Sequence, residues 1–507
     1  MERDEQRRPG IGSRLRHFFS NETSHPDEVP RKEMLFFALG LMGQNEVYNM
    51  AGTHWWVHFC TNVLKLKPET VGKMTGAVTL FDAFNDPIAG ALVDRFRFKD
   101  GRKLLPWIKY TSPFVGILAF LLFVNWNIST PANTLLYCTV IYLLWDVFYS
   151  FQDVALLGVT AAISPDSGQR ARATQWADIG ATLSVGITSM LMPLLSGDGA
   201  FGFTQQQIYF AFAIVMCLGG GFQSMFATLT TERVRSLPEE EEDADGRKKK
   251  KSIFSGISVL RHNHVLLLFL VSEVLRNFTP YVNDIYIFQQ MSFNFMGEPV
   301  PAPVVLTIVG SITGPLSTLP KFFATKIADR VGGMKQVLII GCITGIITKV
   351  LQFTVGIKTL PMFVLMLVLD MVNQLPQSIY MIAQRTMISD SVEYVEWKTG
   401  QRTEGITMSI RNLTSKAASA VQRLVQGYCL KFLDYNADFV EMNRPQSAHF
   451  QKWIWPVYKL GPALGIVFAL LPLLLIRYPN SLKQQVETEM AERRALAEEM
   501  EEAVVEV

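Results

Sequence analysis

Twelve apolar stretches, each long enough to cross a lipid bilayer, dominate this sequence. A membrane-spanning helix needs about 20 mostly apolar residues, and hydrophobic residues make up 49% of the 507-residue chain. Lipid offers no partners to backbone amides and carbonyls, so these stretches are expected to be helical. The predicted spans are 34–60, 71–94, 104–126, 133–163, 173–195 and 206–229, followed by 264–290, 302–327, 335–357, 360–389, 403–433 and 453–477.

The charged residues are gathered mainly outside these stretches. Only 18% of the residues are charged, whereas a soluble domain carries about 25%. The pattern predicts an N-terminal tail over 1–33, a six-helix bundle over 34–229, a charged linker over 230–262, a second bundle over 263–477 and a C-terminal tail over 478–507. It excludes a soluble enzyme, a nucleic-acid-binding protein and a disulfide-rich secreted module.

The distribution of basic residues between the loops predicts the orientation. Loops on the side of the two termini carry 19 Lys and Arg, and the opposite loops carry six. Because basic loops stay in the cytoplasm, both tails and the linker are expected to be cytoplasmic. We therefore expect a multi-pass protein of the plasma or inner membrane.

No catalytic or metal motif accompanies the spans. The five cysteines are far apart and show neither a CxxC pair nor a zinc spacing, so no disulfide or metal role is expected. His54 and His58 stand in HWWVH, which fits an aromatic belt at the outer interface better than a metal site. Phosphate-loop, nucleophile-elbow and HExxH patterns are missing, so neither enzymatic activity nor a resident cofactor is expected.

A short Asp-Arg motif is repeated in the two halves of the sequence. Asp94-Arg95 ends the second predicted span, and Asp329-Arg330 ends the eighth. Related halves place such pairs at matching positions. We expect these four residues to form cytoplasmic contacts that break when the halves move.

Acidic residues inside the second and fourth spans are the strongest functional signal. A charge at the bilayer centre costs between ~3 and ~15 kcal/mol. Asp82 and Asp86 are four residues apart and share a helix face with Asn85 nearby, and Asp146 and Asp153 share a face of the fourth span. A bound cation would relieve both the repulsion and the desolvation, because hard cations prefer oxygen ligands. Protonation would do the same and would couple the chain to H⁺; for Asp86, an ion pair with Arg95 is the structural alternative.

Lys416 is the natural counter-charge for these acids. It lies centrally in the eleventh predicted span, within the small-residue stretch TSKAASA at 414–420. Small residues let helices approach closely. The alternative is a purely structural salt bridge between the halves, and the two interpretations are compatible.

Several motifs resemble the glycoside–pentoside–hexuronide cation symporters of the major facilitator superfamily. FDAFNDPIAGALVDRFRFKDGRKLLPWI at 81–108 is similar to their signature. YSFQDV at 149–154, SPDSGQR at 164–170 and the segment 388–420 resemble further motifs of that family. The resemblance runs over roughly 35–475. It implies an all-α polytopic protein with the major facilitator fold, in which twelve helices form two six-helix bundles around a central cavity.

The resemblance also implies a coupling-cation site. Asp82, Asn85, Asp86 and Ser150 fall at the family's cation-binding positions. Na⁺ or H⁺ would bind there, with Na⁺ held by Asp82 and Asp86.

A substrate site is implied beside it. Asp153 falls where an acid contacts sugar hydroxyls, and Lys416 falls at the lysine that links the cation and sugar sites. Two positions depart from the family pattern: Asn45, preceded by Gln44, replaces an acid, and Asp178 replaces an arginine. Tyr149 and Asn412 complete the predicted substrate-binding set.

These observations predict a secondary active transporter. Cation-coupled symport of a small organic solute, in the first place a glycoside or related sugar, by alternating access is the function they favour. Transport of a lysolipid or another amphiphile, and a solute receptor without transport, stay open as alternatives. The expected partners are the solute, the cation and the bilayer, and the expected state is a monomer. The sequence leaves open the solute, the choice among Na⁺, H⁺ and Li⁺, and the direction of transport.

Overall fold

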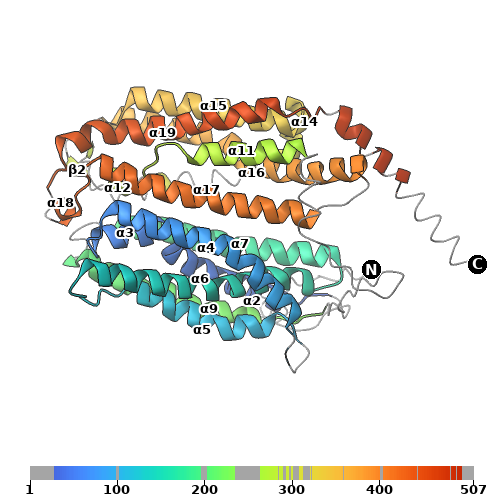
Figure 1. The fold of residues 1–507 in the computed structure, drawn as a ribbon, viewed down its shortest axis with the longest axis horizontal. Coiled ribbons are helices and arrows are strands. Elements are labelled where there is room, and N and C mark those ends of the chain that lie inside the picture. The colour runs from blue at the N-terminus through green and yellow to red at the C-terminus, as the bar shows by residue number, and fades with distance from the viewer. Residues whose placement is uncertain are drawn as a thin grey trace, which may run out of the picture. The chain divides into compact units, whose positions relative to one another are not determined.

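The structure is a computed structural model in which helices dominate the described residues (Figure 1). It describes residues 28–96, 98, 102–195, 202–233, 263–283, 285–288, 293–295, 298–300, 308–311, 320, 323–357, 359–399, 404–441, 444–479, 481–486, 488–490 and 492–493.

The chain divides into two compact units. The first takes in Met1–Leu64, Phe84–Leu191 and Gly202–Glu240, and the second takes in Lys65–Ala83, Met192–Phe201 and Glu241–Val507. The helix that carries Asp82 therefore contributes its two halves to different units, whereas the sequence pattern predicts one boundary at the linker.

The first half of the chain forms a series of long helices with one interrupted element at its end. They are α2 (Arg31–Ala51), α3 (His54–Asn62), α4 (Pro68–Arg95), α5 (Leu105–Leu122), α6 (Pro131–Ala162), α7 (Ser167–Leu195), α8 (Gln205–Phe212), the π-helix η2 (Ala213–Gly219), α9 (Gly220–Ser224) and the 3₁₀-helix η3 (Met225–Leu229).

The second half is also helical, with one small hairpin. Its elements are α11 (His264–Asn277), α12 (Ile285–Phe288), β1 (Phe293–Phe295), β2 (Glu298–Val300), α14 (Ala324–Val331), α15 (Met334–Val355), α16 (Leu360–Thr399), α17 (Glu404–Phe432), α18 (Ala437–Glu441) and α19 (Ala448–Leu475). The two strands pair antiparallel, with Phe293 opposite Val300. Most of the predicted span 302–327 lies outside the described residues.

Local chemistry sets several helix ends. Thr130 accepts a hydrogen bond from the amide of Asn133, and Pro131 occupies the first position of α6, where its missing N–H costs nothing. Ser447 caps α19 in the same way. The first predicted span is broken into α2 and α3 at Gly52 and Thr53.

Six helices in the described part of the chain are long and apolar enough to cross a membrane. They are Leu105–Leu122, Pro131–Thr160, Gln205–Leu229, Met334–Val355, Leu360–Thr399 and Ala448–Leu475. The all-helical membrane architecture is thus confirmed, and the count of twelve spans stays a prediction. Helices such as α4 and α17 are long but carry more polar and charged residues, among them the predicted functional groups.

Within the first unit, glycines let helix backbones touch. A Cβ on Gly221 of α9 would lie 2.4 Å from the Cα of Gly116 on α5. No larger side chain fits there without moving a helix, so these positions fix how α5 packs against the end of the sixth predicted span.

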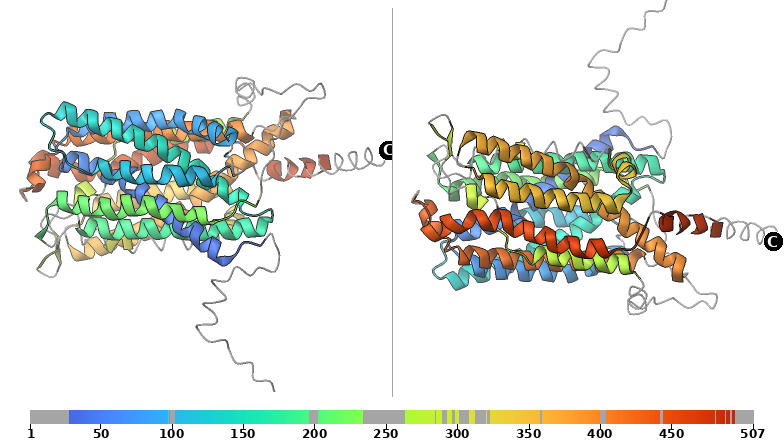
Figure 2. Two further views of the ribbon diagram at one scale, coloured as in Figure 1. Left: turned by 90° about the horizontal axis from the view of Figure 1, so that it is seen from below. Right: turned by 90° about the horizontal axis from the view of Figure 1, so that it is seen from above.

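The core of the second unit lies between α11, α15, α16 and α19 and continues into the C-terminal tail. Its buried residues run from Val265 and Leu338 to Val486 and Met490. Helical turns at 481–486 and 488–490 lie beside the end of α16 (Figure 2). The predicted C-terminal tail is therefore partly a packed element of this unit.

Candidate functional site: intramembrane charges on α4 and α17

The pair formed by Asp82 and Lys416 is the central feature of the candidate site. The Nζ of Lys416 on α17 lies 2.6 Å from Oδ2 of Asp82 on α4, and both side chains are about a quarter exposed. Two residues predicted separately, more than 300 positions apart in the sequence, are therefore brought into direct contact.

Small residues bring α4 and α17 close enough for this contact. A Cβ on Gly72 would lie 2.8 Å from the carbonyl oxygen of Arg423 and 3.1 Å from the Cα of Gly427. One turn further along α4, a Cβ on Gly76 would lie 3.0 Å from the carbonyl oxygen of Ala420. The two helices thus pack backbone against backbone, and Asp82 and Lys416 lie further along the same seam.

Polar contacts continue this seam toward the start of α4. The Nζ of Lys431 lies 3.3 Å from Oε1 of Glu69. The Nζ of Lys73 lies over the ring of Tyr428, 5.8 Å from its centroid. Lys431, Lys73 and Tyr428 are more exposed than the central pair, and each of these two interactions contributes about 0–1 kcal/mol.

The rest of the predicted cation set lies in the first unit. The Asn85 amide donates to Oγ of Ser150 at 3.0 Å, and the Ser150 hydroxyl donates to the backbone oxygen of Asp146 at 3.0 Å. Asn85, Ser150 and Asp146 are all buried, and Asp86 is half-buried. A carboxylate, an amide oxygen and a hydroxyl are thus gathered at the contact of α4 with α6.

Gln44 and Asp153 form the main contact among the predicted substrate residues. The Gln44 amide on α2 donates to Oδ1 of Asp153 on α6 at 2.7 Å, and Gln44 is 3% exposed. The neighbouring Asn45 instead donates to the Leu41 carbonyl of its own helix at 2.8 Å. Asn45 holds the position of the family's acid, but the preceding Gln44 is the amide joined to the fourth-span carboxylate.

An aromatic stack adjoins these polar groups. The ring of Tyr48 stacks on Tyr149 with 5.3 Å between centroids, and Tyr149 stacks on Trp145 at 5.2 Å. Sequence reasoning named Tyr149 but missed Tyr48 and Trp145. Tyr48 lies four residues from Gln44, and Trp145 lies four residues from Tyr149. This spacing was the signal that could have found them, because residues four apart share a helix face.

A second missed contact links α2 to α7. The Asn49 amide donates to Oγ of Ser184 at 3.1 Å. Asn49 lies one turn beyond Asn45 on α2, so the polar face of this helix extends further than predicted.

Ser415, which precedes Lys416 in the chain, contacts an acidic residue of α11. The hydroxyl of Ser415 donates to Oε1 of Glu273 at 2.7 Å, and Arg276 lies over the ring of Tyr380 at 5.7 Å. Asn412 is exposed on α17 and accepts a long contact of 3.5 Å from Arg411.

The remaining predicted residues are not drawn into these clusters. Asp178 is exposed on α7, and Arg95, Asp329 and Arg330 are exposed at helix ends. The side chain of Asp94 lies outside the described part of the structure.

The histidines have structural partners. His58 is fully buried, with Nδ1 at 2.6 Å from the Tyr209 hydroxyl and Nε2 at 2.6 Å from the Asn62 amide. Both ring nitrogens of His58 are therefore engaged within the protein. Among the described residues, no group of three or more His, Cys, Asp or Glu side chains is arranged to hold a metal ion.

One buried charge network escaped the sequence prediction. Lys459 on α19 is 3% exposed and donates to Gln352 at 2.8 Å, and the Gln352 amide donates to Asp370 at 2.6 Å. The signal was a lysine in an otherwise apolar span, which lipid does not tolerate without a partner.

The helical fold with its apolar spans is that of a polytopic membrane transporter of the major facilitator type. The chain belongs to the MFS/sugar transport protein family, whose sequence model matches residues 36–480. The resemblance of the sequence motifs to a family of sugar transporters is therefore confirmed at the level of the family. Members of the family are membrane transporters and not enzymes.

Curated relatives carry names of sugar transporters. The chain is 26% identical over 411 residues to a lactose permease of Leuconostoc lactis, an alignment that covers 76% of this chain and 60% of the permease. It is 23% identical over 451 residues to the isoprimeverose transporter of Lactiplantibacillus pentosus, covering 88% of this chain and 89% of that protein. The chain thus spans about 60% of the length of the lactose permease.

A solved structure supports the fold. A variant of the nucleoside transporter NupG aligns with a TM-score of 0.57 at 13% identity, covering 88% of this chain and 99% of that one. At this identity the likeness concerns the fold alone.

Proposed function

We propose that the protein is a secondary active transporter that couples the movement of a cation to the uptake of a glycoside or related sugar. The observation that carries this proposal is the ion pair of Asp82 and Lys416. On the next turn of α4, Asn85 donates to Ser150 of α6. Acidic side chains within predicted membrane spans are costly to keep, and a bound cation would offset part of that cost.

Coupling follows from competition for one carboxylate. Lys416 already neutralises Asp82 in this conformation. A cation that binds the oxygens of Asp82 and Asp86, assisted by Asn85 and Ser150, displaces the ammonium of Lys416. The released ammonium then becomes available to the solute, so that cation and solute favour each other's binding. Either Na⁺ or H⁺ satisfies this scheme.

The substrate class rests on two supports. Relatives are named for lactose and isoprimeverose. In addition, Gln44 and Asp153 offer an amide and a carboxylate beside the stacked rings of Tyr48 and Tyr149. Carboxylates and amides bind sugar hydroxyls, and aromatic faces cover the apolar faces of a sugar ring.

Transport itself would proceed by alternating access. The loaded form changes state because the two ligands bind one conformation better than the other. The pairs Asp94-Arg95 and Asp329-Arg330, of which Arg95, Asp329 and Arg330 are exposed, are proposed to exchange cytoplasmic contacts in that step. The protein is proposed to work as a monomer in the plasma or inner membrane, with both termini in the cytoplasm.

The test is uptake of labelled glycosides and lysolipids into proteoliposomes, with and without an inward Na⁺ or H⁺ gradient. Gradient-driven accumulation of a sugar is expected for the native chain and is expected to be lost in Asp82→Asn. Asp434→Asn is the matched control, because Asp434 is an exposed acid at φ 55°, a backbone region that Asn adopts readily. Accumulation of lysolipid alone would replace the sugar assignment, and unchanged cation dependence in Asp82→Asn would refute the coupling site.

A further inference from the structure

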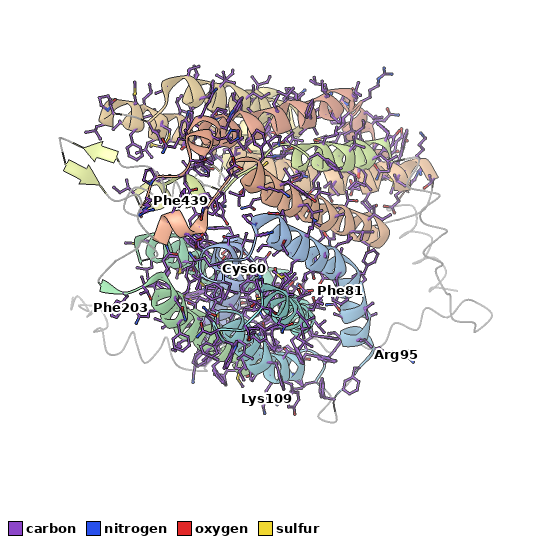
Figure 3. All side chains as sticks on the ribbon, turned by 60° about the vertical axis from the view of Figure 1, so that its left-hand side comes forward. Cys60, Phe81, Arg95, Lys109, Phe203 and Phe439 are labelled. Atoms are coloured by element: carbon purple, nitrogen blue, oxygen red, sulfur yellow. The ribbon has the colours of Figure 1, made fainter. Side chains whose placement is uncertain are left out.

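Basic side chains gather where α4 ends and α5 begins in the first unit. Arg95, Arg102 and Lys109 are exposed, and Lys103 is half-buried. Figure 3 shows Arg95 and Lys109 at the same margin of this unit. Neither the cation site nor the proposed sugar site uses Arg102, Lys103 or Lys109.

An aromatic cluster occupies the same margin. Phe98 lies 5.0 Å from Phe96, 5.7 Å from Trp107 and 6.0 Å from Tyr110, measured between ring centroids. Phe96 is 53% exposed and Tyr110 is 59% exposed. Large aromatic side chains this exposed call for an apolar or interfacial environment on their outer side.

Packing against α6 holds the aromatic cluster in place. Trp107 stacks on Phe151 of α6 with 5.0 Å between centroids and 9° between planes. The amide of Phe98 donates to the carbonyl of Arg102 at 3.2 Å, which joins an aromatic residue of the cluster to a basic one. The contact of Trp107 with α6 and the hydrogen bond between Phe98 and Arg102 therefore fix the position of the aromatic cluster.

The nearby carboxylate of Glu232 is turned inward. Its Oε2 accepts from the amide of Lys103 at 3.0 Å, and its Oε1 accepts from the amides of Leu104 and Leu105 at 2.9 and 2.7 Å. Glu232 is 9% exposed and satisfies the free amides at the start of α5. Its charge is directed to the start of α5, and the exposed charged side chains described at this margin are those of Arg95, Arg102 and Lys109.

We propose that this aromatic–basic margin, made of Phe96, Phe98, Arg102, Trp107, Lys109 and Tyr110, binds the headgroup of an anionic phospholipid. Aromatic rings settle at the headgroup level of a bilayer, and basic side chains beside them pair with lipid phosphate. A soluble phosphate would satisfy the charges but leave the rings in water. The rings thus favour a lipid, and the positive charge favours an anionic one.

The experiment counts lipids on the purified full chain. The protein is equilibrated with equal amounts of phosphatidylglycerol and phosphatidylcholine, and bound lipids are counted by native mass spectrometry. The native chain is expected to retain phosphatidylglycerol preferentially. One basic residue near an anionic surface changes partitioning about five-fold, so Arg102→Gln with Lys109→Gln is expected to lower the preference at least ten-fold.

Two further measurements make the result decisive. Lys452→Gln removes another basic residue that lies over an aromatic ring, that of Trp453 at 5.7 Å, and is expected to leave the preference unchanged. Tyr110→Ser is expected to weaken retention while keeping all the charges. An unchanged preference in the double variant, an equal loss in Lys452→Gln, or displacement of phosphatidylglycerol by millimolar inorganic phosphate would each overturn the proposal. Lipid counting needs no transport, so its outcome is independent of the proposed symport.

Discussion

Lys416 donates to Asp82 across the contact of α17 with α4, with 2.6 Å between Nζ and Oδ2. Both side chains are partly exposed, so solvent screens the pair and holds its net contribution to about 1 kcal/mol. A bond of that strength is stable at rest and yet can be exchanged for a ligand during a transport cycle. The close approach at Gly72 and Gly427 then keeps the two helices together while the charges change partners.

The first prediction concerns competition between Lys416 and the cation. Lys416→Gln removes the ammonium that occupies Asp82, so cation binding is expected to tighten, by roughly five-fold for a pair of about 1 kcal/mol. Cation-driven sugar accumulation is expected to fall at the same time, because the link to the solute is gone. Titration calorimetry with Na⁺ and proteoliposome uptake measure the two effects. Weaker cation binding in this variant would contradict the competition.

The second prediction concerns Ser150. Ser150→Ala removes the hydroxyl that accepts from Asn85, and an uncharged hydrogen bond of this kind contributes about 1 kcal/mol. Cation affinity is expected to fall about five-fold without loss of folding. Thr188→Ala is the matched control, because Thr188 is similarly buried and donates to the Ser184 carbonyl of its own helix. Equal losses in both variants would assign the effect to helix packing.

The third prediction separates two neighbouring amides. Gln44→Ala breaks the 2.7 Å bond to Asp153 and is expected to raise the KM for sugar about ten-fold. Asn45→Ala removes an amide that donates within its own helix, and it is expected to change the KM less than two-fold. Initial rates of uptake at saturating cation measure both. A larger rise of the KM in Asn45→Ala than in Gln44→Ala would indicate that Asn45, and not Gln44, contacts the sugar.

The motif positions and the helical class were predictable because apolar runs and intramembrane charges are properties of single segments. The sequence predicted that Lys416 balances the charge of the acids on the second and fourth spans. It did not predict that Lys416 would lie within direct contact of Asp82. The preference for Gln44 over Asn45 depends on the rotation of α2 about its axis, which the sequence pattern does not specify. The network of Lys459, Gln352 and Asp370 joins three helices, and only tertiary packing brings it together.

The fourth prediction tests the seam between α4 and α17. A methyl group on Gly72 would lie 2.8 Å from a backbone oxygen that cannot step aside, so Gly72→Ala is expected to lower the stability by about 1–3 kcal/mol. Gly90→Ala on the same helix adds its methyl group to open space and is the matched control. Thermal unfolding in detergent compares the two. Equal melting temperatures would show that the helices separate there without cost.

The last prediction concerns the docking of the C-terminal tail on α16. The indole Nε1 of Trp397 donates to Oε2 of Glu489 at 2.5 Å, and Lys483 lies 2.8 Å from Asp390. The hydrogen bond from Trp397, followed by that from Gln485, holds the pKa of the Glu489 carboxyl below its ordinary value. A lowered pKa in the folded state means that the contribution of this carboxylate is complete above its ordinary pKa of about 4.3. It is lost as the pH falls through the lowered value.

The signal of Trp397 in a chain labelled with fluorotryptophan reports this contact, and Trp397→Phe identifies the signal. Its chemical shift is expected to stay constant above the ordinary carboxyl pKa of about 4.3 and to change only at lower pH. Glu489→Gln is expected to show the shifted signal throughout, because its amide accepts more weakly than a carboxylate. A transition in the native chain near neutral pH would mean that a group other than Glu489 controls the docking of the tail.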